Sequence, residues 1–281
     1  MIVHDLNITI EGACKRSILM DLTYNSSNGS MPLIVFCHGY KGFKDWGAWS
    51  LLSEALATSG FAVLKFNFSH NGGTCKQPID FPDLEAFGNN NYTKELEDLD
   101  RVISWAQRAQ FKYRGIDTSN IILIGHSRGG SIVTIKASED SRVRKVISLA
   151  GVSNFKTRFP KGKELQKWKK TGVRYVENGR TKQKMPHYYQ FYKDFITNES
   201  RLTIKTAVKK MKIPFLIVHG DADNSVSINE ALSLHKWSPR SQLIVLEGAN
   251  HVFGSSHPWS LSILPPYFHQ IHTEITHFIN N

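Results

Sequence analysis

The sequence predicts an α/β protein with a mainly parallel, twisted central sheet and helices on both faces. Short apolar runs, typical of strands buried on both faces, alternate along the chain with segments that have helical periodicity. Such alternation is the pattern of repeated β-α-β units. The 281 residues are 41% hydrophobic and 21% charged, which fits a folded protein with a full core. We therefore expect a single domain over residues 1–281.

The first two elements differ from the rest of the chain. Residues 3–12 and 16–25 are β-rich, with a turn at Gly12 between them and a polar loop after them. They predict an antiparallel hairpin at one edge of the sheet. Asp5 and Glu11 interrupt the apolar stretch that a signal peptide would need, and no apolar run reaches the length of a membrane span.

The remaining elements follow in a regular order. The run 32–39 is continuously apolar, the segment 49–60 has a helical pattern that ends at Gly60, and 61–68 is again apolar. The segment 92–109 has the pattern of a strongly amphipathic helix. Its apolar face consists of Leu96, Leu99, Val102, Ile103 and Ala106. Further strands are expected at 121–125, 145–151, 214–220 and 242–248, and further helices at 129–138, 227–237 and 266–280.

Four short polar motifs follow the ends of expected strands. They read HGYKG, GHSRGG, HGDAD and GANH. In an open parallel sheet, ligands bind at the carboxyl ends of the strands. We therefore expect the loops that carry these motifs to meet at one edge of the sheet.

The motif GHSRGG has the pattern of a nucleophilic serine at a sharp turn from strand to helix. Gly125 and Gly129 are small where the strand and the helix must pass closely, and the apolar run before them and the helical run after them supply the expected context. A serine hydroxyl needs a neighbouring base and an oxyanion site to act as a nucleophile. The turn would place the amide of Arg128 at a helix N-terminus, where it favours negative charge.

With these motifs, the chain from about Pro32 onwards resembles the α/β-hydrolases, and most of all the dienelactone-hydrolase-like and cinnamoyl (feruloyl) esterase-like branch. In that superfamily the nucleophile, the acid and the histidine follow one another along the chain, each after a strand. The resemblance implies Ser127 as nucleophile, Asp223 as acid and His251 as base. It also implies that the backbone amides of Tyr40 and Arg128 form the oxyanion hole.

Each of these assignments has a competitor in the sequence. Asp221 lies in the same loop as Asp223, but it is expected to cap a turn by accepting backbone hydrogen bonds. His257 follows His251 by six residues and is its main rival among the twelve histidines. His126 is expected to point away from the serine beside it, and His38 to stabilise its own loop.

A basic segment lies between the expected strands at 145–151 and 214–220. Residues 152–212 contain 17 lysine and arginine residues and four acidic ones, whereas the rest of the chain has a balance of −2. The resemblance implies a cap at this place, inserted after the sixth strand. The segment mixes Trp168 and the run HYYQFYKDF with lysines. The aromatic residues either select an aromatic, acyl or acidic group, or pack the cap onto the sheet while the lysines face water.

The leading functional hypothesis is a serine hydrolase that cleaves a small carboxylic ester through an acyl-enzyme. The alternatives are a lipase, an amide-cleaving peptidase and a non-catalytic binding protein on the same scaffold. Nucleic-acid binding through the basic segment is not expected. Neither a cofactor nor a metal ion is expected, because no dinucleotide or P-loop fingerprint and no HExxH spacing occurs. The default location is the reducing cytoplasm, because three widely spaced cysteines form no CxxC pair: Cys14, Cys37 and Cys75.

Overall fold

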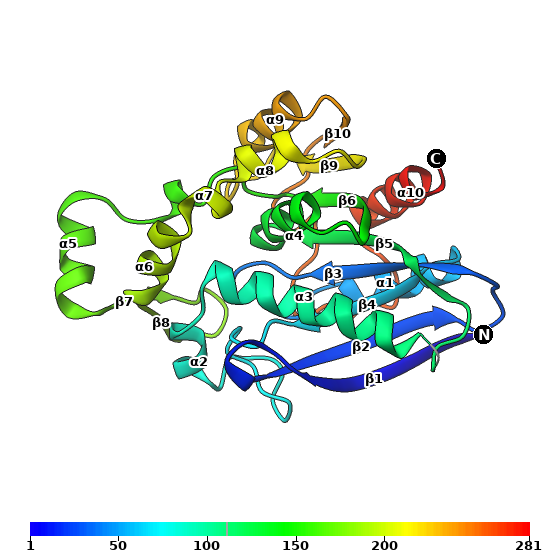
Figure 1. Ribbon diagram of the computed structural model, residues 1–281, viewed down its shortest axis with the longest axis horizontal. Coiled ribbons are helices and arrows are strands. Elements are labelled where there is room, and N and C mark those ends of the chain that lie inside the picture. Colours follow the sequence, from blue (N-terminus) through cyan, green and yellow to red (C-terminus); the bar gives the residue numbers. More distant parts are fainter. Residues whose placement is uncertain (111) are drawn as a thin grey trace.

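The computed structural model describes residues 1–110 and 112–281. Its centre is an eight-stranded sheet with the strand order β1-β2-β4-β3-β5-β6-β9-β10 (Figure 1). The strands are β1 (Ile2–Glu11), β2 (Ser17–Asn25), β3 (Met31–Cys37), β4 (Ala62–Asn67), β5 (Ile116–His126), β6 (Val143–Leu149), β9 (Phe215–Gly220) and β10 (Ser241–Leu246). The helices that flank it are α1 (Trp49–Thr58), α3 (Tyr92–Ala109), α4 (Arg128–Glu139), α8 (Ile204–Lys210), α9 (Ile228–Trp237) and α10 (Pro266–Asn280).

The pairing confirms the predicted fold class. Strands β1 and β2 form an antiparallel pair, and β2 is also antiparallel to β4. Every other pairing in this sheet, from β4 to β10, is parallel. The predicted hairpin is therefore an antiparallel edge on an otherwise parallel sheet, which is a common arrangement in α/β folds.

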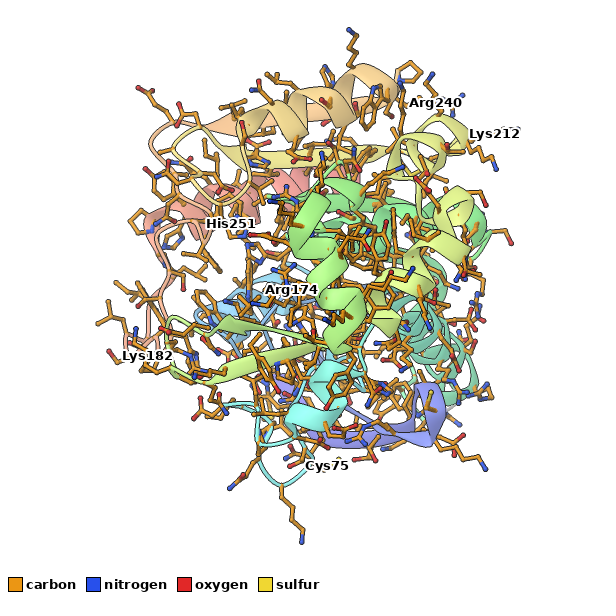
Figure 2. All side chains as sticks on the ribbon, turned by 90° about the vertical axis from the view of Figure 1, so that its left-hand side faces the viewer. Cys75, Arg174, Lys182, Lys212, Arg240 and His251 are labelled. Carbon is orange, nitrogen blue, oxygen red and sulfur yellow. The ribbon has the colours of Figure 1, made fainter. Side chains whose placement is uncertain are left out.

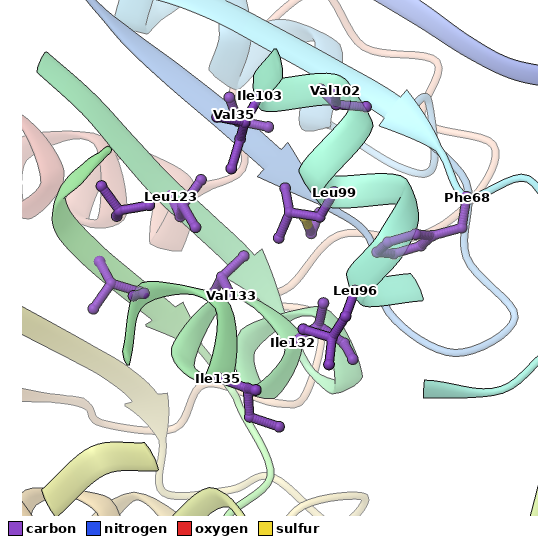
Figure 3. Close-up of a cluster of buried hydrophobic side chains, with 14 of the residues drawn as sticks. Val35, Phe68, Leu96, Leu99, Val102, Ile103, Leu123, Ile132, Val133 and Ile135 are labelled. Carbon is purple, nitrogen blue, oxygen red and sulfur yellow. The ribbon is translucent and has the colours of Figure 1, made fainter. Parts of the chain in front are cut away.

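Two hydrophobic cores lie on the two faces of the sheet. Successive side chains of a strand point to opposite faces, so Val35 of β3 packs with α3 and α4 while Phe36 packs with α1 and α10. Figure 3 shows the first core, where Leu96 and Leu99 of α3 approach Leu123 of β5 and the apolar side of α4. The amphipathic face predicted for residues 92–109 is buried in this core.

The segment 152–212 forms the structure between β6 and β9. It contains α5 (Gly162–Thr171), the antiparallel pair β7 (Val173–Glu177) and β8 (Lys184–Tyr188), α6 (Gln190–Thr197), α7 (Glu199–Leu202) and α8. In Figure 1, α5, α6 and the β7–β8 hairpin project on the left, beyond the ends of the central strands, whereas α8 packs against α4 and α9. The short helix α2 (Leu84–Gly88) contacts β8 from below.

Among the residues that the structure describes, no helix is both long enough and apolar enough to cross a membrane.

Candidate active site

Ser127 lies at the turn that joins β5 to α4. Its backbone has φ 55° and ψ −119°, a strained conformation for a residue other than glycine. A Cβ atom on Gly125 would lie 2.2 Å from the carbonyl oxygen of Gly129, and one on Gly129 would lie 2.4 Å from the carbonyl oxygen of Cys37. Both glycines are therefore required sterically, because strand and helix backbones touch on either side of the serine.

Three residues from three loops form a hydrogen-bonded chain. Oγ of Ser127 is 3.0 Å from Nε2 of His251, and Nδ1 of His251 is 2.7 Å from Oδ2 of Asp223. The loop after β9 carries Asp223, and the loop after β10 carries His251. Hydroxyl, imidazole and carboxylate in this order have the geometry of a nucleophile, a general base and an orienting acid.

The environment of Asp223 keeps its carboxylate ionised. Its side chain is fully buried, and burial by itself would raise the pKa. Hydrogen bonds from His219 and His251 and from the amide of Val226 outweigh this effect, so the pKa lies well below its ordinary value. A stable negative charge at Asp223 fixes the proton of His251 on Nδ1 and leaves Nε2 free to accept the serine proton.

His219 is a part of this arrangement that the sequence did not indicate. It is completely buried, and its Nε2 lies 2.8 Å from the carbonyl oxygen of Val226 and 3.3 Å from Oδ2 of Asp223. The residue precedes Asp223 by four positions at the end of β9, within the apolar run that predicted the strand. The only feature of the sequence that could have indicated a role for His219 is its position at the end of a strand that leads to Asp223.

The two main competitors have other contacts. Asp221 accepts a hydrogen bond from the amide of Gly248 at 2.7 Å and so links the loops after β9 and β10. His257 accepts a hydrogen bond from the amide of Gly47 at 3.1 Å, and its ring packs against Phe43 and Trp46.

His38 of the HGYKG motif and His126 of the GHSRGG motif form hydrogen bonds with the main chain. Nδ1 of His38 donates to the carbonyl oxygen of Gly39, and its Nε2 accepts from the amide of Phe68. Nε2 of His126 donates to the carbonyl oxygen of His251 at 2.8 Å. Burial lowers the pKa of His38 to about 4 and that of His126 to about 3. Both rings are therefore neutral at pH 7 and brace the loops around Ser127.

The loop after β3 passes directly beside the serine. A Cβ atom on Gly39 would lie 3.0 Å from Cβ of Ser127 and 3.1 Å from the carbonyl oxygen of His126, so a side chain at this position would crowd the turn. The next residue is Tyr40, and neither its amide nor that of Arg128 donates a hydrogen bond to another residue in the described part of the chain. Two unused backbone donors beside a nucleophile are suited to stabilise an oxyanion.

The side chain of Arg128 is 15% exposed, lies among aromatic rings and forms an ion pair. Its guanidinium lies 3.2 Å from Oε1 of Glu95, whose side chain is 3% exposed, and 4.5 Å from the centre of the Tyr40 ring. Burial raises the pKa of Glu95, and the charge of Arg128 opposes this rise. The sequence did not reveal this pair, because 33 residues separate its members and Glu95 lies in a helix full of charges.

A pocket of about 480 Å³ opens on one side of Ser127. We call it the aromatic pocket. Its walls come from Ser127 and His251, from the segment 152–212 and from α3. Its rings include the stacked pair Tyr92 and Phe155, with centres 3.7 Å apart. The lining residues are Tyr40, Lys41, Tyr92, Ser127, Arg128, Val152, Phe155, Arg158, Phe159, Trp168, Arg174, Val176, His187, Phe191, Ser225, Val226 and His251.

A second pocket of about 540 Å³ lies on the other side of the serine. Tyr40, Lys41, Ser127 and His251 line both pockets. The β7–β8 hairpin also contributes to both, with Arg174, Val176 and His187 on the aromatic side and with its turn, residues 178–180, on the other. The second pocket is completed by residues of the loops after β3 and β10, among them Trp46, Ser255 and His257.

No group of three or more histidine, cysteine or carboxylate side chains in residues 1–110 and 112–281 is placed to hold a metal ion.

Solved structures share the fold of this chain. A structure titled ferulic acid bound to Est1E, from Butyrivibrio proteoclasticus, superimposes with a TM-score of 0.72, at 18% identity and with 97% of this chain and 98% of that chain covered. A dienelactone hydrolase from Anabaena variabilis superimposes with a TM-score of 0.64, at 13% identity and with 99% and 97% covered. Together with the sheet order, these similarities show the α/β-hydrolase fold.

Curated relatives match a smaller part of the chain. An uncharacterised 31.7 kDa protein from the traX-finO intergenic region of Escherichia coli is 30% identical over 129 residues, which are 45% of this chain and 40% of that protein. The quorum-quenching protein AidA of Acinetobacter baumannii (strain MDR-ZJ06) is 28% identical over 117 residues, which are 42% and 34%. The chain thus matches less than half the length of either relative.

The model of one protein family covers most of the chain. The BD-FAE model matches residues 20–238, from β2 to the end of α9. This range contains Ser127, Asp223 and the whole basic segment. The match leaves out residues 1–19, which include the outer hairpin strand β1, and residues 239–281, which include β10 and His251. The chain belongs to the BD-FAE family.

Proposed function

We propose that the protein is a serine hydrolase that cleaves carboxylic esters through an acyl-enzyme. One observation carries the proposal: Ser127, His251 and Asp223 form an unbroken hydrogen-bonded chain at the junction of two pockets. A nucleophile between two pockets has room for the acyl part of an ester on one side and for the alcohol on the other.

The first half of the reaction forms the acyl-enzyme. Nε2 of His251 accepts the proton of Ser127 while Oγ attacks the carbonyl carbon of the ester. The negative charge that develops on the carbonyl oxygen is stabilised by the amides of Tyr40 and Arg128, and each donor contributes roughly 3 kcal/mol. The imidazolium then protonates the alcohol oxygen as the bond to the carbonyl carbon breaks.

The second half returns the enzyme to its starting state. Water attacks the acyl carbon and gives a proton to His251, and Oγ of Ser127 leaves with the proton that the imidazolium returns. The ionised Asp223 stabilises the imidazolium in both halves. The acid and the alcohol are the products.

We assign the acyl group to the aromatic pocket. Its walls hold the rings of Tyr92, Phe155, Phe159, Trp168 and Phe191, which suit a flat, apolar acyl group. The structure titled with ferulic acid bound to Est1E shows that a protein of the same fold holds an aromatic acid. The second pocket then receives the alcohol.

The test compares the wild type with Ser127→Ala. We expect a fluorophosphonate probe to label the wild type at Ser127 and the purified protein to hydrolyse chromogenic aryl and alkyl esters. Ser127→Ala should lose labelling and about 10⁴-fold or more in kcat. Substitution of Ser131, a buried serine of α4 outside both pockets, is the matched control, and Ser131→Ala should still be labelled. Ester hydrolysis that persists in Ser127→Ala would refute the mechanism.

A further inference from the structure

The aromatic pocket contains an unusual charge pattern. Four of its lining side chains are cationic, namely Lys41, Arg128, Arg158 and Arg174, and none is a carboxylate. A pocket with apolar walls and charges of one sign concentrates the electrostatic field and attracts ligands of opposite charge. Whether the pocket has such a field depends on how many of the four cations form no ion pair with a carboxylate of the protein.

Two of the four cations are neutralised by the protein. Arg128 forms the ion pair with Glu95, and Arg158 lies 2.6 Å from a carboxylate oxygen of Glu230. Each pair has a net charge of zero, so neither guanidinium requires a ligand.

Arg174 has no such partner. No carboxylate of the described residues lies within 4 Å of its guanidinium, which instead lies 5.5 Å from the centre of the Trp168 ring. Lys41 also lacks a carboxylate and donates to the backbone carbonyl of Glu177 at 3.3 Å. Partly buried positive charges are costly without compensation, and a bound anion would offset that cost.

The hairpin directs Arg174 into the pocket. Arg174 and His187 face each other across the β7–β8 ladder, so their side chains share the face that lines the pocket, while the neighbouring Tyr175 is 60% exposed. Burial lowers the pKa of His187 to about 3, and the charges of Arg128 and Arg174 contribute to this shift. Figure 2 shows Arg174 and His251 on the same face of the molecule, which the positive segment 152–212 partly covers.

We propose that the aromatic pocket takes an acyl group that carries a carboxylate at the end remote from the scissile ester, and that Arg174 binds this carboxylate. The inference rests on the proposed function, because it concerns the acyl group of the same reaction. It narrows the substrate class to half-esters, in which one carboxyl group is esterified and another is free. The guanidinium of Arg174 would bind the free carboxylate through charge-assisted hydrogen bonds. The ring of Trp168 would stabilise the same guanidinium through a cation–π contact.

The experiment compares substrates that differ only in this charge. Ethyl 4-carboxycinnamate is paired with ethyl 4-carbamoylcinnamate, and monoethyl terephthalate with its monoamide as a shorter pair. Carboxylate and carboxamide have nearly the same shape, so the ratio of their kcat/KM values reports charge recognition. We expect the wild type to prefer the carboxylate of at least one pair by about tenfold or more, the effect of one charge-assisted hydrogen bond.

Substitutions then assign the preference to one residue. Arg174→Gln should lower the ratio at least fivefold, and Arg174→Lys should restore part of it. Lys170→Gln removes the same charge from an exposed position of α5 outside the pocket, and its ratio should equal that of the wild type. The carboxylate preference should also weaken between 50 and 500 mM salt. A wild type without preference for either carboxylate, or an unchanged ratio in Arg174→Gln, would overturn the inference and leave the proposed esterase intact.

A binding measurement separates the two proposals. If the wild type hydrolysed none of the esters and took up no fluorophosphonate, the proposed function would fail. The proposed carboxylate subsite at Arg174 would then be tested by calorimetry, which measures the binding of each ester to Ser127→Ala, a variant that cannot hydrolyse it. Tighter binding of the carboxylate member of a pair, lost when Arg174→Gln is added, would support the subsite. Equal binding of the two members would overturn it.

Discussion

The guanidinium of Arg128 lies 4.5 Å from the centre of the Tyr40 ring. The two residues whose amides are the proposed oxyanion donors are thus joined through their side chains, although they come from different loops. Tyr40 is also hydrogen bonded to His187 of β8 at 3.0 Å, and Arg128 to Glu95 of α3. These contacts connect the proposed oxyanion donors to the β7–β8 hairpin and to the core helix α3.

Removing the charge of Arg128 should therefore affect both stability and catalysis. Arg128→Met leaves the carboxylate of Glu95 buried without its ion partner, and breaking a buried pair in this way costs about 3–5 kcal/mol in free energy of unfolding. Chemical denaturation measures this loss. The double variant Arg128→Met/Glu95→Gln should recover part of the stability, because no buried charge is left unpaired. If it recovered stability but not kcat, the side chain of Arg128 would be needed to position the oxyanion site.

The two aspartates of the loop after β9 should differ strongly. Asp223→Asn keeps the shape of the side chain but no longer fixes the proton on Nδ1 of His251, and kcat should fall about 10⁴-fold. Asp221→Asn only weakens the bond to the Gly248 amide and should reduce kcat less than about tenfold. Steady-state kinetics on one chromogenic ester compares them. A larger loss in Asp221→Asn would show that the two roles are exchanged.

The two histidines of the loop after β10 provide a similar pair. His251→Ala removes the proposed base and should reduce kcat by about 10⁴-fold or more. His257→Ala should change KM more than kcat, because His257 lines the second pocket and does not contact Ser127 in the described structure. Measurements with several alcohols and a constant acyl group would reveal this effect on KM. An unchanged kcat in His251→Ala would contradict the assignment.

The two glycines beside the serine should not tolerate a methyl group. In Gly125→Ala and Gly129→Ala the new Cβ would overlap with backbone atoms of Gly129 and Cys37, which cannot move aside as a side chain could. We expect a loss of several kcal/mol in stability or failure to fold. Gly179→Ala is the control and should fold normally, because no atom lies within 4 Å of the place that its new methyl group would take in the hairpin turn. Thermal unfolding ranks the three variants.

The buried carboxyl of Asp98 should produce a measurable pH dependence. It accepts hydrogen bonds from the amides of Ala13 and Ser69, yet burial raises its pKa from 3.8 to about 6. Between these values the folded state binds more protons at this site than the unfolded state does. Its contribution to stability therefore falls as the pH rises through that window.

The test for Asp98 is a difference between two proteins. Asp98→Asn cannot titrate, so the free energy of unfolding of the wild type minus that of the variant should decrease from pH 4 to pH 6 and then level off. Urea denaturation at each pH gives both values. A difference that rises over this range would show that the carboxylate is stabilised, and not destabilised, by its surroundings.

The sequence predicted the sheet because its signals are local. The run that became β3 is apolar at every core position, and the period of 92–109 matches the buried face of α3. The four motifs could be expected to meet because the carboxyl ends of parallel strands share one edge. The catalytic roles of Ser127, Asp223 and His251 stay predictions, although these residues do lie together in the expected order.

Other features depend on contacts that no local pattern encodes. The strands β7 and β8 lie in a lysine-rich segment without clear alternation of polar and apolar residues, and they contact each other, α2 and α5. The pairing of Arg128 with Glu95 and the meeting of Arg174 with Trp168 arise only when distant elements pack. The pockets, which are spaces between such elements, are therefore the part of the site that the sequence did not describe.

One short hairpin forms walls of both pockets. If the two halves of an ester occupy these pockets, a substitution that shifts β7 against β8 changes the fit of the acid and of the alcohol together. Selection for a new acyl group would then alter tolerance for leaving groups as a side effect, and the two preferences would be inherited as a unit. Exchange of residues 173–188 between relatives should transfer both at once.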